Sequence, residues 1–155
     1  MLKLCKPEAE DLSYRSALLM DEATMAYNEK WGGTIDFSRQ KWDAWYEKWL
    51  LSDEKERYYR YLYSQELQTF VGEVAYRFDE TYGVHIASII VEANYRGKGF
   101  GRAGLRLLME AAKENGITKL CDDIAADNPS VALFLQEGFR EVWRNEDCVM
   151  VEKIL

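Results

Sequence analysis

The feature that most constrains the fold is the glycine-rich, basic stretch VEANYRGKGFGRAG at residues 91–104. It joins the apolar run at residues 89–91, typical of a strand buried on both faces, to a helical pattern that begins near Phe100. Glycines let a backbone turn sharply beside a ligand, and the first N–H groups of a helix lack internal partners. An ordinary strand-to-helix turn also uses glycine, but Arg96, Lys98 and Arg102 add positive charge here. The stretch therefore predicts a phosphate cradle.

Composition limits the classes of protein that fit. A length of 155 residues predicts one domain over residues 1–155, and 48% hydrophobic with 14% aromatic residues supports a packed core. A net charge of −7 argues against nucleic-acid or anionic-membrane partners and favours a cationic one. Cys5, Cys121 and Cys148 lack the close spacing of a metal site, so we expect free thiols and no metal. Acids directly after Pro7 argue against a signal sequence, so we expect a cytoplasmic protein.

The hydrophobic patterns predict alternating strands and helices in one chain. We expect a first helix over residues 9–29, an aromatic helix that contains Trp42, Trp45 and Trp49, and a third helix that ends at Asn115-Gly116. The aromatic helix either faces the core or forms a partly open wall that holds a substrate. The expected strands are 2–5, 58–64, 70–78, 84–91, 117–126, 139–144 and 149–155, with a short helix between Asn128 and Gly138. This order predicts an α+β fold with a mixed sheet.

Two motifs in this order resemble the GNAT superfamily of acetyl-CoA-dependent N-acetyltransferases. Arg96-x-x-Gly99-x-Gly101 fits the superfamily's R/Q-x-x-G-x-G/A signature for pyrophosphate binding. Asn128 followed by a short helix and Gly138-Phe139 resembles a later segment of the same family. The resemblance covers nearly the whole chain. It implies a mostly antiparallel sheet of about seven strands and about four helices, with the strands at 84–91 and 117–126 splayed apart.

The resemblance also implies where coenzyme A binds. The pantetheine would lie along the strand that ends at Val91, whose amide would polarise the thioester carbonyl. The pyrophosphate would meet the turn, and Asn128 with the following helix would line the other side. The implied cofactor-binding residues are Ile89, Ile90, Val91, Arg96, Gly97, Lys98, Gly99, Phe100, Gly101, Arg102, Asn128 and Phe134.

Two positions depart from the family pattern. Many members carry a tyrosine four residues before the glycine of the Gly-Phe pair, where its hydroxyl protonates the leaving thiolate, but this chain has Phe134. Either water or another side chain protonates the thiolate, or the step needs no acid, or the protein binds coenzyme A without efficient turnover. Asn128 also lies one residue closer to Gly138 than is usual.

An alkylammonium must lose a proton before its nitrogen attacks, so a base is required. The candidates are His85, which occupies the offset of the catalytic glutamate in lysine-acetylating members, Glu73 on the neighbouring strand, and the consecutive acids Asp122 and Asp123. Each also has a structural interpretation: a satisfied histidine, a solvent-facing glutamate, or aspartates at a frayed strand. Consecutive acids in a central strand nevertheless predict that at least one faces an open cleft.

The segment Trp31-Gly32-Gly33 lies between the first two helices, a region that shapes the acceptor site in this superfamily. An acidic, aromatic site would suit a cationic amine. One alternative is a coenzyme A-binding sensor without catalysis. Another is a dinucleotide-binding protein, because Gly99-x-Gly101-x-x-Gly104 also fits that fingerprint, although hairpin strands precede it here instead of βαβ units. The last two strands could pair between chains in a homodimer.

Overall fold

The computed structural model describes residues 1–155 and contains one seven-stranded sheet in the order β1-β2-β3-β4-β5-β7-β6. Neighbouring strands are antiparallel except β4 and β5, which are parallel. The predicted mixed sheet is therefore confirmed. The strands are β1 (Leu2–Cys5), β2 (Arg57–Ser64), β3 (Thr69–Asp79), β4 (Val84–Val91), β5 (Lys119–Ala125), β6 (Arg140–Arg144) and β7 (Cys148–Ile154).

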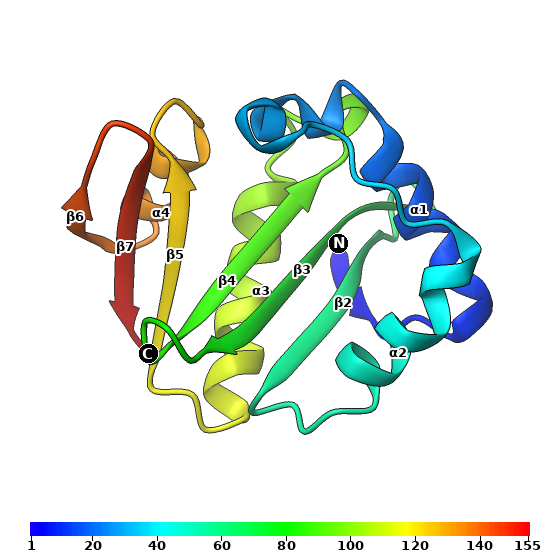
Figure 1. Cartoon of the computed structure of the whole chain (residues 1–155), viewed down its shortest axis with the longest axis horizontal. Helices are drawn as coiled ribbons and strands as arrows, with labels where there is room; N and C mark the ends of the chain where they lie inside the picture. The colour runs from blue at the N-terminus through cyan, green and yellow to red at the C-terminus, as the bar shows by residue number, and fades with distance from the viewer.

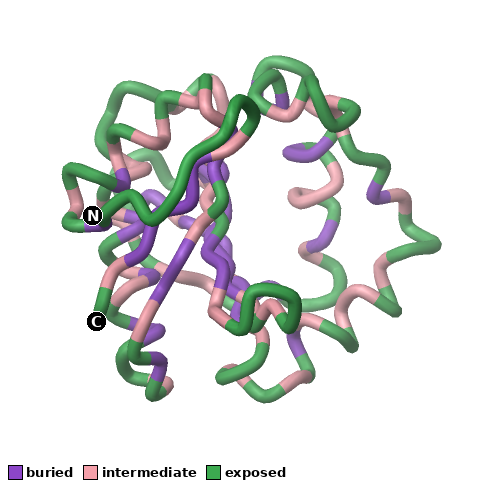
Figure 2. The backbone as a smooth tube through the Cα atoms, turned by 60° about the vertical axis from the view of Figure 1, so that its left-hand side comes forward, coloured by how far each residue is buried: buried purple, intermediate pink, exposed green.

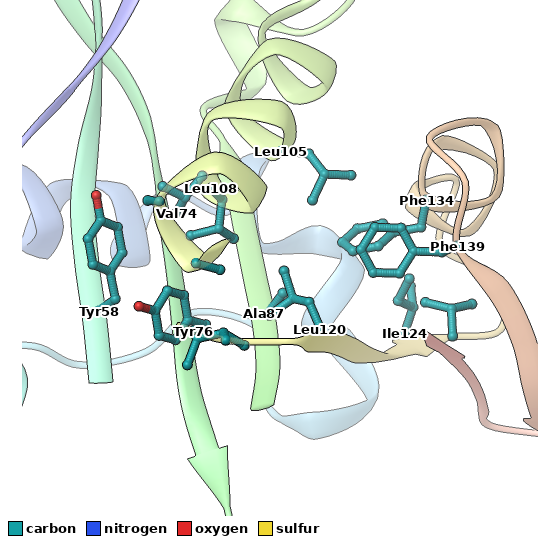
Figure 3. Close-up of a cluster of buried hydrophobic side chains, with 14 of the residues drawn as sticks. Tyr58, Val74, Tyr76, Ala87, Leu105, Leu108, Leu120, Ile124, Phe134 and Phe139 are labelled. Carbon is teal, nitrogen blue, oxygen red and sulfur yellow. The ribbon is translucent and has the colours of Figure 1, made fainter. Parts of the chain in front are cut away.

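Four α-helices cover the two faces of the sheet (Figure 1). They are α1 (Leu12–Met20), α2 (Trp42–Leu50), α3 (Phe100–Glu114) and α4 (Ser130–Gln136). The apolar stripe of α3 packs on one face, where the main core includes Leu105, Leu108 and, from α4, Phe134 (Figure 3). Helices α1 and α2 pack on the opposite face in two smaller clusters with residues of β2, β3 and β4. Buried residues accordingly follow the central strands, whereas the connecting loops are exposed (Figure 2).

Strands β4 and β5 separate soon after they begin. They pair only at His85 with Leu120 and at Ile86 with Cys121, and beyond these residues the two strands diverge (Figure 1). Strand β5 instead pairs along its whole length with β7. The backbone of β4 from Ala87 to Val91 therefore has no strand beside it on the β5 side, and the sheet opens there.

The prediction of one helix over residues 9–29 is wrong. The structure has the 3-10 helix η1 (Ala9–Asp11), then α1, and then a second 3-10 helix, η2 (Thr24–Trp31). The break follows Asp21, whose backbone is extended with ψ 111°. The fully buried Thr24 fixes η2 in place, because its hydroxyl donates to Asp21 and accepts from the Ala93 amide. Tertiary hydrogen bonds thus override the continuous helical pattern.

The remaining short elements are η3 (Arg39–Lys41) and η4 (Ala93–Tyr95). Helix α2 begins directly after η3 and confirms the helix that the aromatic pattern predicts. None of the helices combines the length and the apolar character that crossing a lipid bilayer requires.

Candidate active site

The opening of the sheet contains two adjoining cavities. One, here called the turn cavity, has a volume of about 340 Å³ and lies against the glycine-rich turn. The other, here called the wide cavity, has a volume of about 470 Å³ and lies between the splayed strands and the α1/η2 side. Tyr27, Ile89, Asn128 and Ser130 line both cavities, so the two form one continuous cleft.

The turn cavity offers unpaired backbone donors. The amides of Gly97, Lys98 and Gly99 donate no hydrogen bond within the protein, and the first amides of α3 have no intrahelical acceptor. Gly97 and Gly99 have φ values of 78° and 85°, which disfavour side chains, and a Cβ on either would meet nothing within 4 Å. The backbone is therefore open toward a ligand, and the arrangement fits a pyrophosphate.

The side chains of the basic residues have other partners. Arg96 donates to the carbonyl oxygens of Val91 (Nε, 3.0 Å) and Thr24 (Nη2, 2.8 Å), which joins the turn to η2. Arg102 donates to Gln136 Oε1 at 2.6 Å. Lys98 makes no such bond, but neither Lys98 nor Arg102 lines the turn cavity. The positive charge predicted from the sequence is present, whereas the contacts available to an anion in this cavity come mainly from the backbone.

The register of β3 and β4 directs specific amides of β4 into the opening. The Glu92 amide donates to the Val71 carbonyl at 2.8 Å, and Ile90 pairs with Glu73. Hydrogen bonding alternates along an antiparallel strand, so the amides of Ile89 and Val91 point away from β3, toward the splayed β5. This geometry fits the expectation that an amide near Val91 polarises a thioester carbonyl.

Glu73 is the central acid of the wide cavity. Only 5% of its side chain is exposed, and its Oε2 accepts a hydrogen bond from the Tyr59 hydroxyl and lies 3.5 Å from Arg15 Nε. Its Oε1 has no partner within the protein, and the residue lines the cavity. Because Glu73 is the register partner of Ile90, this carboxylate lies beside the stretch of β4 that offers its amides to the opening.

Asp122 and Asp123 both line the wide cavity, as the consecutive acids in β5 predict. Burial and the charge of Asp123 raise the pKa of Asp122 well above its usual range. Burial also raises the pKa of Asp123, whose side chain is more exposed. Carboxyl groups with raised pKa values can accept protons near neutral pH, so both remain candidates for proton transfer.

The raised pKa of Asp122 predicts a pH-dependent cost to stability. The folded state holds this proton more tightly than the unfolded state, so stability falls as pH rises from about 4 through the raised pKa. Asp122→Asn should therefore raise Tm by at least about 2 °C at about pH 8, with little gain at about pH 4. Thermal unfolding followed by circular dichroism at both pH values measures this.

The matched control for Asp122→Asn is Glu146→Gln in the exposed turn between β6 and β7, which changes the net charge equally. It should leave Tm within about 2 °C at both pH values. An equal gain for Asp122→Asn at low and high pH would contradict the ionisation argument.

The structure does not bring His85 into the cleft. It shares a face of β4 with Ala87, which belongs to the core beneath α3. Its Nε2 donates to the Lys55 carbonyl oxygen at 2.7 Å, and its ring packs edge-on against Tyr76 and Phe78. The expected role of His85 as the base therefore has no geometric support. The distance in sequence from Val91 places His85 on β4, but the register of the sheet decides which face its side chain occupies.

Not all of the other predicted residues line one of the two cavities. Trp31 is 53% exposed and lines the wide cavity, but Gly32 and Gly33 line neither cavity and instead terminate η2. Phe134 is fully buried, packs on Phe139, and offers no hydroxyl at the edge of the wide cavity. The predicted cofactor residues that line the turn cavity are Ile89, Ile90, Val91, Arg96, Gly97, Gly99, Phe100, Gly101 and Asn128.

Sequence patterns carried no signal for three residues of this cleft. Arg15 comes from α1, Tyr59 from β2, and Tyr27 from η2, far from the glycine-rich turn in the chain. Burial and the charges of Glu73 and Asp122 raise the pKa of Tyr27 to about 12, so its hydroxyl stays protonated at neutral pH. Only the folded chain places these side chains around one cavity.

The sheet opens beside a turn with free backbone amides, and a carboxylate lies next to the opening. This architecture is typical of a group-transfer enzyme that binds a phosphate-bearing donor. The model of the Acetyltransferase (GNAT) family matches residues 18–139, so the chain belongs to this family of acetyltransferases. Solved structures with this fold contain CoA or acetyl-CoA. The resemblance seen in the sequence is thereby confirmed.

Solved structures share the fold over nearly the whole chain. A spermidine N-acetyltransferase from Vibrio cholerae, in complex with CoA and spermine, is 20% identical over 99% of this chain and 95% of that one, with a TM-score of 0.78. A ribosomal-protein-alanine N-acetyltransferase from Brucella melitensis is 25% identical (100% and 99% covered, TM-score 0.74). The yncA protein of Salmonella typhimurium, whose structure contains acetyl-CoA, is 21% identical (100% and 94%, 0.74). No curated protein sequence matches significantly.

Proposed function

We propose that this enzyme transfers the acetyl group of acetyl-CoA to a primary amine by direct attack of the amine nitrogen. The observation that carries the proposal is the position of Glu73. Its carboxylate lines the wide cavity with Oε1 unpartnered, beside Ile90 and one residue from Val91. A base thus lies next to the place where the strand amides would hold a carbonyl group.

Acetyl-CoA, when bound, supplies a thioester whose carbonyl carbon the amine attacks and whose sulfur leaves. The amides of Gly97 to Arg102 would hold its pyrophosphate, and the β4 edge from Ile89 to Val91 would hold the pantetheine. The wide cavity, with its aromatic walls and carboxylates, would then hold the amine. This division assigns one end of the cleft to each substrate.

Glu73 would remove the proton that the amine carries in water, directly or through one water molecule. The Tyr59 hydroxyl and the Arg15 guanidinium hold Oε2, which leaves Oε1 for the proton. Tyr27 lines both cavities, and its hydroxyl keeps its proton at neutral pH. Tyr27 could thus protonate the leaving thiolate in place of the tyrosine that Phe134 replaces.

Gly101 tests the donor site. A Cβ at Gly101 would stand 3.4 Å from Leu133 Cδ2, so alanine fits, whereas a larger side chain would extend into the turn cavity. Calorimetry should show that Gly101→Leu raises the Kd for acetyl-CoA at least about tenfold, a loss of about 1.4 kcal/mol. Gly101→Ala, the control, should bind about as the unmodified protein does.

Thiol release with acetyl-CoA and a panel of primary amines tests the reaction itself. Release that depends on an amine, with an acetylated amine identified by mass spectrometry, is the expected result. Binding of acetyl-CoA with no release on any amine would contradict the proposed transfer and favour a role in sensing coenzyme A. Binding of NAD but not of CoA would contradict the assigned donor site.

A further inference from the structure

The guanidinium of Arg15 is an unusual group to find in the wall of a cavity that binds an amine. It stands over three aromatic rings, with its carbon 4.7 Å from the Phe37 centroid, 4.5 Å from Trp45 and 5.5 Å from Tyr59. These cation–π contacts fix the side chain without using its N–H donors in hydrogen bonds. The rings thus position a cation that lines the wide cavity.

The donors of Arg15 are largely unused. Its Nε has no hydrogen-bond partner and lies 3.5 Å from Glu73 Oε2, and no side-chain nitrogen of Arg15 donates a hydrogen bond within the protein. A guanidinium has five N–H donors, and 16% of this side chain remains exposed. A bound anion would satisfy donors that the protein leaves free.

The charges of the cavity point to a ligand that carries both signs. Arg77 is paired with Asp79 at 2.7 Å, and Glu73 faces Arg15 and Tyr59. The cavity therefore presents the Arg15 side-chain nitrogens, which donate no hydrogen bond, and the carboxyl groups of Asp122 and Asp123, which make no ion pair. A polyamine would use only negative groups and would meet the Arg15 charge unfavourably.

We propose that Arg15 forms a carboxylate subsite in the wide cavity and that the acceptor is a free amino acid. The proposal rests on the proposed function, because it identifies the acceptor of the same reaction. The adjacent Glu73 offsets part of the Arg15 charge, so the site suits a singly charged carboxylate better than a phosphate with nearly two charges. The amino group would then lie on the Glu73 side of the cavity, beside Ile90.

The test measures discrimination between matched acceptors. Thiol release is assayed with the protein L-amino acids, and the best one is compared with its α-carboxamide, its decarboxylated amine, spermidine and glucosamine 6-phosphate. We expect kcat/KM for the amino acid to exceed that for its amide at least about tenfold, as charge-assisted hydrogen bonds allow. Equal or faster turnover of the amide, spermidine or the sugar phosphate would overturn the proposal.

Variants of Arg15 distinguish a loss of carboxylate recognition from a loss of folding. Arg15→Gln should reduce the acid-to-amide ratio to about one, mainly through KM. Arg15→Lys keeps a cation beside Glu73 and the rings but loses the planar fork, so it should fold and lose part of the ratio. Arg77→Gln, which removes an ion-paired cation from the same cavity, should leave the ratio unchanged. An unchanged ratio in both Arg15 variants would overturn the proposal.

Binding distinguishes failure of this inference from failure of the proposed function. Calorimetry with the CoA complex compares each amino acid with its amide. If no acceptor is acetylated but an amino acid binds at least about tenfold more tightly than its amide, and Arg15→Gln abolishes the difference, the carboxylate subsite stands and the transfer reaction does not. If amines are acetylated without any preference for a carboxylate, the transfer reaction stands and the carboxylate subsite does not.

Discussion

Glu73→Gln is expected to lower kcat by about 10²- to 10⁴-fold while the Kd for acetyl-CoA stays unchanged. Glutamine keeps the size of the side chain and can still accept the hydrogen bond from Tyr59, but it cannot take a proton from the amine. Steady-state kinetics across pH, with acetyl-CoA binding measured by calorimetry, provide the test.

Tyr59→Phe is the matched control for Glu73→Gln. It removes the hydrogen bond to Oε2 but keeps the carboxylate, so it should reduce kcat much less than Glu73→Gln. A Glu73→Gln enzyme with nearly full kcat would show that Glu73 is not the base. The role would then pass to Asp122 or Asp123, the other carboxyl groups that line the wide cavity.

Gly72→Ala is expected to lower Tm by at least about 3 °C and to weaken acetyl-CoA binding. A Cβ at Gly72 would stand 2.1 Å from the Ile90 carbonyl oxygen and 3.0 Å from Val91 Cα. Both atoms are backbone, so β4 itself would have to move, and overpacking of this kind costs about 1–3 kcal/mol. The movement would displace the amides of Ile89 and Val91, which face the opening.

Gly104→Ala provides the comparison for Gly72→Ala. Its Cβ would meet the Leu62 side chain at 2.9 Å and the Ile89 side chain at 3.2 Å, and these side chains can shift where backbone cannot. We expect a smaller loss of Tm and little change in the acetyl-CoA Kd. Thermal unfolding and calorimetry on both variants decide the matter, and equal effects would contradict the argument from β4.

The parts of the fold that depend on local sequence were predictable. The glycines of the turn require positive φ, and the apolar spacing after Phe100 specifies the face of α3. Both signals are local in the chain and need no distant partner. The bounds of the strands and the position of the turn cavity therefore lie close to those predicted from the sequence. Asp122 and Asp123 likewise predicted an open cleft beside β5, and both line the wide cavity.

Residue roles that depend on distant contacts were not predictable. Residues 9–29 have the pattern of one helix, and only the contacts of Thr24 with Arg96 and Ala93 show why the chain breaks there. His85 and Glu73 were both candidates for the base, and the register places one under α3 and the other in the wide cavity. A slip of one residue in register exchanges the two faces of a strand, and a single sequence carries little information about register.

The sequence alone indicated the family, because the glycine-rich turn is a local backbone feature whose residues are contiguous. The spacing of its glycines and basic residues was enough to predict a phosphate cradle at residues 91–104. Only the tertiary structure assembled the wide cavity, because Arg15, Tyr59 and Glu73 come from three different elements. Their meeting depends on how α1 packs over the sheet, which is a property of the whole chain.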